Sequence, residues 1–335
     1  KKRIFFRVDG DQGNYAGLGH IYRSLKIYFY LKKKFKKPHN FFFISKNYIA
    51  GLRILKKKTN EKIFLYNDKF IKDFKFEKKD LILIDTLGAE KEFIKKLNSS
   101  KVYKIVSFDE LNTRIFKKGI IINGIYFAKK SVSSKNKKIK IFQGVKYILL
   151  DDDFKKKKYI EQNNNILVTS GGADKKNFLY KVSKILLKQE LKDSKIFVLI
   201  GNAVKKDNLV FKLKDKKNLY LVSNVEKIKK YLDLCSVVIT SGGTVMFESI
   251  SAGRITFVIK TYEHQKYAIN YFQKLNLITK FTYLKNLDTN KLINKIKFVY
   301  KNKEISKKQF KKNISFIDGK GFDRTKKILI DYINK

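Results

Sequence analysis

The stretch RIFFRVDGDQGNYAGLGHIYRSL, residues 3–25, decides the fold. Its apolar start, 3–9, is typical of a buried strand, and a glycine-containing loop separates it from a periodic segment that predicts a helix over about 19–35. A strand, a glycine loop and a helix in this order open a βαβ unit. The sequence therefore predicts a parallel sheet covered by helices.

The same rhythm continues along the chain. Further short apolar runs predict buried parallel strands at 41–45, 62–66, 81–85, 103–109 and 119–124, and then at 195–201, 218–223 and 254–260. The segments 165–172 and 236–243 each predict a strand followed by a loop. Helices are predicted at 177–189, 225–235, 244–253 and 325–334. The polar segment 151–165 interrupts the series as a linker would. We expect an α/β protein of two Rossmann-like domains, 1–153 and 154–335, with a cleft between them.

The charge of the chain first suggests a nucleic-acid partner. The 335 residues include 77 Lys and Arg against 30 Asp and Glu, which gives a net charge of +47. Arginine, which nucleic-acid binders favour for bidentate contacts, occurs at only seven positions, and the chain is rich in residues with AT-rich codons. Genome composition therefore explains the charge, and no specific nucleic-acid partner is expected. The remaining cationic field would favour capture of a dianionic ligand.

Other bounds concern cofactors and location. The single cysteine, Cys235, excludes an intrachain disulfide, and the three histidines lack zinc-type spacing, so neither a metal nor a cofactor is expected. No run of 18 apolar residues is present, so no transmembrane segment is expected. A cytoplasmic protein is the resulting expectation, and its oligomeric state stays open.

The first candidate site lies in the loop that opens the chain. His20 would occupy the N-terminus of the first helix, where the helix dipole disfavours imidazolium and favours a neutral general base. Asp9, at the end of the preceding strand, could orient this imidazole. The alternative is a tight turn with a surface histidine. The residues expected to contact substrate here are Arg7, Gly17, Gly19 and Arg23.

Two matching TSGG turns form the second candidate site. Each follows a predicted strand and precedes a helix, so backbone N–H groups and hydroxyls could hold a diphosphate there. Glu248, four residues after Thr244, could accept ribose hydroxyls. Ordinary turn chemistry is the alternative. The residues concerned are Gly171, Gly172 and Asp174 in the first turn, and Ser241, Gly242, Gly243 and Thr244 in the second.

Two carboxylates complete the candidate residues. Asp85 ends the predicted strand 81–85, and Asp109 ends the strand 103–109. Both would lie at the carboxyl edge of the first sheet, where they could hold a sugar or assist His20. Capping of the following helices is the equally simple alternative.

The order of these motifs resembles a known family. The pattern R-x-D…G-x-G-H-x-x-R, I-D-x-x-G, S-F-D-[DE], G-G-x-D-x-x-N, S-G-G-T-x-x-[FW]-E and D-G-x-G-x-x-R covers the chain from about residue 3 to 325. It is similar to the UDP-2,4-diacetamido-2,4,6-trideoxy-β-L-altropyranose hydrolases of pseudaminic acid biosynthesis and to their spore-coat polysaccharide relatives. These share the GT-B architecture with the lipid II glycosyltransferase.

The resemblance implies an activity. It implies removal of UDP from the nucleotide sugar with inversion at C1, with His20 as the catalytic base, and it implies that the C-terminal half binds UDP. Gln265, in the EHQ stretch, would lie near the nucleotide sugar. Helix N-termini at residues 173 and 244 would hold the leaving phosphates. The sequence departs from the family pattern at Leu87, Asp151 and His264.

Two other functions stay open. A GT-B glycosyltransferase could use the same UDP-sugar site with an acceptor hydroxyl in place of water, and its lysine-rich N-terminal surface could then weakly contact an anionic membrane. A non-catalytic polyanion-binding protein would instead show steeply salt-dependent binding and no UDP affinity.

Overall fold

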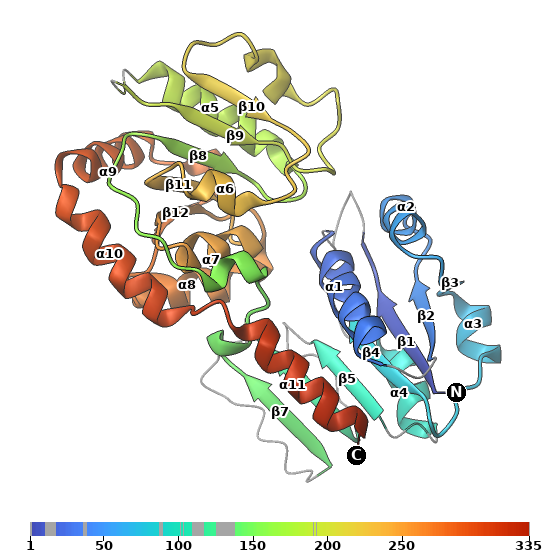
Figure 1. The fold of residues 1–335 in the computed structure, drawn as a ribbon. Helices are drawn as coiled ribbons and strands as arrows, with labels where there is room; N and C mark the ends of the chain where they lie inside the picture. The colour runs from blue at the N-terminus through green and yellow to red at the C-terminus, as the bar shows by residue number, and fades with distance from the viewer. Residues whose placement is uncertain are drawn as a thin grey trace. The chain divides into compact units, whose positions relative to one another are not determined.

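A computed structural model describes residues 2–10, 18–35, 39–86, 90–100, 102, 104–108, 117–124, 138–189, 191 and 193–334. The chain divides into two compact units. Unit 1 contains Lys1–Leu149 together with Gly321–Lys335, and unit 2 contains Leu150–Lys320. Each unit is built around its own parallel sheet (Figure 1).

In its described residues, unit 1 holds a seven-stranded parallel sheet with the order β3-β2-β1-β4-β5-β6-β7. The strands are β1 (Arg3–Val8), β2 (Asn40–Ser45), β3 (Lys62–Leu65), β4 (Leu81–Asp85), β5 (Lys104–Phe108), β6 (Gly119–Asn123) and β7 (Ile139–Gln143). The helices are α1 (Gly19–Lys34), α2 (Ile49–Lys58), α3 (Asp68–Asp73), α4 (Lys91–Ser99) and α11 (Gly321–Asn334).

Alternation along β1 explains why helices cover both faces of this sheet. Ile4, Phe6 and Val8 pack in one cluster with α1, whereas Phe5 packs in another with side chains of α4. Successive side chains of a strand point to opposite faces, so the continuous apolar run 3–8 buries both of them.

The terminal helix α11 belongs to unit 1. Its Phe322, Leu329 and Ile333 lie in the same apolar cluster as the buried side of α1, and Lys104 Nζ donates to the Ile333 carbonyl over 2.6 Å. The predicted second domain, 154–335, includes this helix. Its amphipathic pattern predicted a buried face but carried no information about the partner, and in the structure that partner is the first sheet.

In its described residues, unit 2 holds a six-stranded parallel sheet with the order β10-β9-β8-β11-β12-β13. The strands are β8 (Ile166–Thr169), β9 (Ile196–Leu199), β10 (Leu219–Val222), β11 (Val237–Thr240), β12 (Ile255–Ile259) and β13 (Thr279–Phe281). The helices are α5 (Phe178–Lys188), α6 (Ile228–Leu232), α7 (Thr244–Ser251), α8 (Lys266–Lys274), α9 (Thr289–Lys301) and α10 (Lys303–Phe316).

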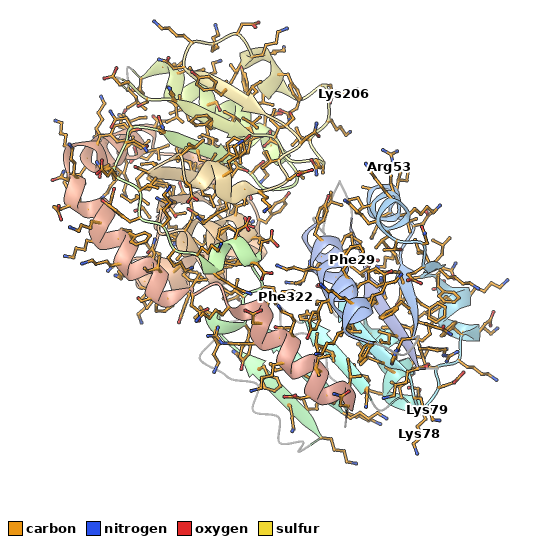
Figure 2. All side chains as sticks on the ribbon, viewed as in Figure 1. Phe29, Arg53, Lys78, Lys79, Lys206 and Phe322 are labelled. Atoms are coloured by element: carbon orange, nitrogen blue, oxygen red, sulfur yellow. The ribbon has the colours of Figure 1, made fainter. Side chains whose placement is uncertain are left out.

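Basic side chains project to solvent from both units (Figure 2). The labelled examples come from α2 (Arg53), from the turn before β4 (Lys78 and Lys79) and from the loop after β9 (Lys206). These three regions are far apart in sequence and belong to different elements. None of the helices in the described part of the chain combines the length and the apolar character that a membrane-spanning segment needs.

Candidate functional site

His20 lies in the first turn of α1, as the sequence predicted. The helix begins at Gly19 after Leu18, which makes no side-chain capping bond. The His20 side chain is 11% exposed, which leaves the ring within reach of solvent and of a small ligand.

Asp85, at the end of β4, is the carboxylate that contacts this histidine. His20 Nδ1 lies 2.7 Å from Asp85 Oδ1. Arg23, one turn further along α1, grips the same carboxylate with two donors: its Nε donates to Oδ2 over 2.6 Å and its Nη2 to Oδ1 over 2.5 Å. The three side chains form one group, which we call the open cluster.

The charge of the open cluster fixes how the imidazole can react. Burial by itself raises the pKa of Asp85, but the charge and hydrogen bonds of Arg23, together with His20, hold that pKa well below its usual value. Asp85 is therefore an anion that only accepts hydrogen bonds. A neutral His20 that donates its Nδ1 proton to Asp85 keeps a lone pair on Nε2, which is the arrangement of a general base.

Asp9 does not orient His20 in the structure. It forms two hydrogen bonds with Arg7, of 2.5 and 2.6 Å, and accepts a third from the backbone N–H of Lys46. Arg7 also pairs with Glu90 and is fully buried. We call Arg7, Asp9 and Glu90 the closed cluster. Because both Asp9 oxygens are committed to it, the prediction that Asp9 supports His20 is wrong, and Asp85 takes that place.

Two residues that contact Arg7 were not predicted from the sequence. Glu90 was not singled out, and Tyr66 places its ring 4.1 Å from the Arg7 guanidinium. Burial by itself lowers the pKa of Arg7, but the charges of Glu90 and Asp9 raise it above its usual value. One signal was available: Arg7 and Asp9 are two positions apart at a strand end, and such residues share a face.

Of the other predicted substrate contacts in unit 1, Gly19 and Arg23 lie in the described residues. Gly19 is the first, exposed residue of α1 and Arg23 belongs to the open cluster. Gly17 and Asp109 lie outside the described residues.

In unit 2 the two TSGG turns lie side by side. Their strands β8 and β11 are hydrogen-bonded neighbours, with Thr169 paired to Thr240 in register. The Ser241 hydroxyl donates to the Ser170 carbonyl over 3.3 Å, which links one turn to the other. A diphosphate site built from both turns is therefore geometrically possible.

The second turn has an open helix N-terminus. Gly243 is the N-cap of α7 and provides no side chain to bond the first N–H groups, and Thr244 is exposed. A Cβ at Gly243 would meet no atom nearer than 3.8 Å, whereas one at Gly242 would come within 2.6 Å of Ile269. Gly242 therefore packs against α8, and the space beside Gly243 is free for a ligand.

The first turn differs at its helix. The sequence predicts a helix N-terminus at residue 173, but α5 begins at Phe178. Asp174 Oδ1 accepts the Leu179 N–H over 3.1 Å, so a carboxylate of the chain occupies the position predicted for a phosphate. Like charges repel, and α5 is therefore a poor phosphate site. Gly171, with a φ of +87°, and Gly172 still leave open space beside the turn.

Gln265 lies beside the second turn. Its Oε1 accepts hydrogen bonds from the Thr261 N–H and hydroxyl and from the Tyr262 N–H, so the amide plane is fixed. A Cβ on Gly242 would lie 3.0 Å from the Gln265 Cβ, which shows how closely the two residues pack. Glu248 lies one turn into α7 and is half-buried.

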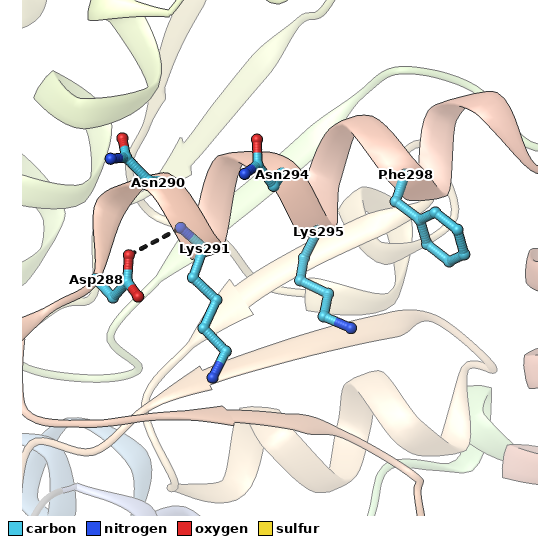
Figure 3. Close-up of a pocket in the computed structure, with 6 residues that line it drawn as sticks. All are labelled: Asp288, Asn290, Lys291, Asn294, Lys295 and Phe298. Carbon is cyan, nitrogen blue, oxygen red and sulfur yellow. Dashed lines mark hydrogen bonds between the residues drawn. The ribbon is translucent and has the colours of Figure 1, made fainter.

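A separate surface depression runs along α9 (Figure 3), and it is not a candidate active site. Its lining comes from the N-cap and one face of a single helix, and includes no histidine or cysteine. No group of three or more His, Cys, Asp or Glu side chains placed to hold a metal occurs in the described parts of the two units. The depression is lined by Asp288, Asn290, Lys291, Asn294, Lys295 and Phe298.

The two parallel-sheet units define the GT-B fold. Over 100% of this chain the structure is similar to MurG of Acinetobacter baumannii, with a TM-score of 0.67 at 12% identity and 99% of that chain covered. The calicheamicin glycosyltransferase CalG4 gives a TM-score of 0.66 at 10% identity, covering 100% of this chain and 99% of its own. The complex of Staphylococcus aureus MnaA with UDP gives 0.62 at 11% identity, covering 100% and 97%.

Sequence comparison points the same way. Residues 165–324 match the glycosyltransferase family 28 C-terminal domain. The spore coat polysaccharide biosynthesis protein SpsG of Bacillus subtilis (strain 168) is 26% identical over 266 residues, which cover 77% of this chain and 78% of that protein. The expected likeness to spore-coat polysaccharide proteins and to GT-B structures is thus confirmed.

Proposed function

We propose that the protein is a glycosyltransferase that moves a sugar from a UDP-sugar donor to an acceptor hydroxyl, with inversion at C1, in the synthesis of a surface polysaccharide. The contact between His20 Nδ1 and Asp85 carries this proposal, because it provides an anion-supported imidazole whose Nε2 keeps its lone pair at a helix start. The match of residues 165–324 and the likeness to a polysaccharide biosynthesis protein support the choice of chemistry.

In the proposed reaction, His20 takes up the proton of the acceptor hydroxyl and UDP leaves with the electrons of the broken bond. His20 Nε2 removes the proton from the acceptor hydroxyl as its oxygen forms the new bond to C1, and the C1–O bond to UDP breaks with both electrons leaving on the diphosphate. Asp85 stabilises the imidazolium that results. UDP is a stable leaving group, so acid catalysis at its oxygen is not required by this scheme.

Unit 2 would bind the nucleotide. The uncapped N-terminus of α7 offers unpaired N–H groups and the positive end of a dipole to the leaving phosphates. The open space at Gly171, Gly172 and Gly243 would let the backbone approach them, and Glu248 and Gln265 would contact ribose and sugar. The predicted role of residue 173 is not carried forward, because Asp174 occupies that site.

Hydrolysis is the second candidate. It is favoured by the motif order around Arg7, Asp9, His20 and Arg23, which resembles the hydrolases of UDP-linked diacetamido-trideoxy sugars. Water would then replace the acceptor hydroxyl, with His20 in the same role.

One experiment separates the two activities. Purified protein is incubated with a panel of UDP-sugars, including UDP-linked diacetamido-trideoxy sugars, with and without candidate acceptors, and released UDP and free sugar are quantified with anomeric NMR. UDP release that requires an acceptor supports transfer, and stoichiometric free sugar without acceptor supports hydrolysis. Absence of UDP binding by calorimetry would refute both.

A further inference from the structure

We infer that Arg23 is a positioning residue that offsets the charge of Asp85 and thereby sets the pH range in which His20 works as a base. The inference rests on the proposed function for its catalytic meaning, but its geometry stands by itself. Arg23 holds both oxygens of Asp85, at 2.6 and 2.5 Å, while His20 shares one of them at 2.7 Å.

The spacing on α1 places this arginine for the role. Residues three apart on a helix are neighbours on one face, so His20 and Arg23 reach the same carboxylate at the end of β4. Arg23 Nη2 also lies 3.1 Å from His20 Nδ1. Since Nδ1 donates its proton to Asp85, the guanidinium acts on the imidazole as a nearby positive charge rather than as a hydrogen-bond donor.

A second arginine–aspartate pair shows what a purely structural version looks like. Arg3 grips Asp80 in the same two-donor manner, with Nε 2.8 Å from Oδ1 and Nη2 2.7 Å from Oδ2. It lies at the opposite, amino end of β1 and β4. In the described residues the Asp80 carboxylate bonds to Arg3 and to the backbone N–H of Glu77. The chain thus provides a matched control for Arg23.

Two charged side chains of the described residues contact the His20 imidazole. Asp85 and Arg23 contact the imidazole directly. The closed cluster lies next to the open one, at the end of β4. Thr86, the residue after Asp85, donates to Glu90, and Val8 pairs with Asp85 across the strands. Its three charges, on Arg7, Asp9 and Glu90, bond mainly to one another.

Removing the Arg23 charge has a defined consequence. Asp85 would then face His20 as an uncompensated anion, which stabilises the imidazolium form. The imidazole would hold its proton to higher pH and would be a poorer base near neutral pH. A bidentate arginine on the supporting carboxylate prevents this while keeping the carboxylate oriented.

The test follows the histidine itself. The chain contains only three histidines, so long-range ¹H–¹⁵N NMR of ¹⁵N-histidine protein can follow each imidazole, with His20 assigned by loss of its signal in His20→Asn. We expect Arg23→Gln to raise the midpoint pH of the His20 titration by about one unit. Arg3→Gln, the matched control, is expected to leave it unchanged. An unchanged or lowered midpoint in Arg23→Gln overturns the inference.

Arg23→Lys gives an independent test should the glutamine variant unfold. Lysine keeps the positive charge but cannot donate to both oxygens of Asp85. The midpoint pH of the His20 titration is therefore expected to stay near the wild-type value, while kcat falls because Asp85 holds the imidazole less firmly. A midpoint raised by about one unit in the lysine variant overturns the charge explanation.

Activity distinguishes this inference from the proposed function. The acid limb of kcat/KM is expected to move up with the NMR midpoint in Arg23→Gln. If the NMR midpoint rises and the pH profile does not follow, His20 is not the catalytic base, and the proposed function fails while the charge inference stands.

Discussion

The open and closed clusters lie at the same edge of the first sheet, on neighbouring strands, and are built from similar residues. Each has an arginine that holds an aspartate with two donors. In the closed cluster Arg7 is fully buried and its charge is divided between two carboxylates. In the open cluster one carboxylate is shared by Arg23 and by the partly exposed His20.

This difference shows what separates a structural ion pair from a reactive one. The closed cluster consists of a fully buried arginine and the two carboxylates that pair with it, and it contains no imidazole. The open cluster has such a group, with one ring nitrogen fixed by Asp85 and the other left for chemistry. Four predictions test whether the two clusters divide stability and reactivity in this way.

The largest effect is expected from Arg7→Met. The substitution leaves Asp9 and Glu90 buried without their cation, which should lower the free energy of unfolding by about 3–5 kcal/mol. Urea denaturation followed by circular dichroism measures this, with the exposed Arg53→Met as the control. A loss below about 1 kcal/mol would remove the closed cluster from its structural role.

The converse is expected of His20→Asn. Turnover should fall by about 10²-fold or more because the base is lost, while UDP affinity and stability stay near wild type. UDP release and calorimetry measure the two properties. His39→Asn, whose ring stacks on Phe35 4.3 Å away, is the control and should keep full activity. A fully active His20→Asn variant would show that His20 is not the catalytic base.

A smaller effect is expected on acid stability in Asp85→Asn. The folded-state pKa of Asp85 is lowered, so its contribution to stability is complete above the ordinary value of about 4 and is lost as the pH falls towards the folded value. The variant lacks this contribution and should lose stability less steeply below pH ~4. Thermal unfolding across that range measures the slope, with exposed Asp215→Asn as the control. Equal slopes in wild type and variant would contradict it.

The smallest effect is expected from Tyr66→Phe. The ring that Arg7 packs against is kept, so stability at pH 7 should change by under about 0.5 kcal/mol. Burial and the charge of Glu90 raise the pKa of Tyr66 to about 12, so the folded state keeps a proton that the unfolded state loses from about pH 10. Wild-type stability should therefore fall more steeply between pH 10 and 12 than that of the variant. Equal slopes in the two proteins would show that Tyr66 ionises in the folded protein as it does in the unfolded chain.

Much of the framework could be predicted from the sequence. The apolar runs marked buried strands within a residue or two, for instance 81–85 for β4 and 119–124 for β6. The helix start at Gly19 followed from the glycine loop before it, and each TSGG motif follows a strand as predicted. The pairing of β8 with β11 was not predicted from the sequence. Local patterns sufficed because each reflects the chain's own periodicity.

The partners within the site could be predicted only in part. Asp9 and Asp85 both end strands at one edge, and nothing in the linear sequence says which of them turns towards His20. That choice was decided by Arg7, which lies two residues before Asp9 and takes both of its oxygens. The Asp174 cap was missed for a similar reason, because a carboxylate after a glycine turn suits a ligand site and a helix cap equally well.

The return of α11 to unit 1 affects how the protein is made. On the ribosome, the sheet of unit 1 emerges first, but the helix that contributes Phe322, Leu329 and Ile333 to its core emerges only after all of unit 2. Part of the apolar face of the unit 1 sheet therefore stays uncovered while unit 2 is synthesised. Aggregation during synthesis should consequently involve unit 1 first, and a chain cut before Gly321 should expose the same surface permanently.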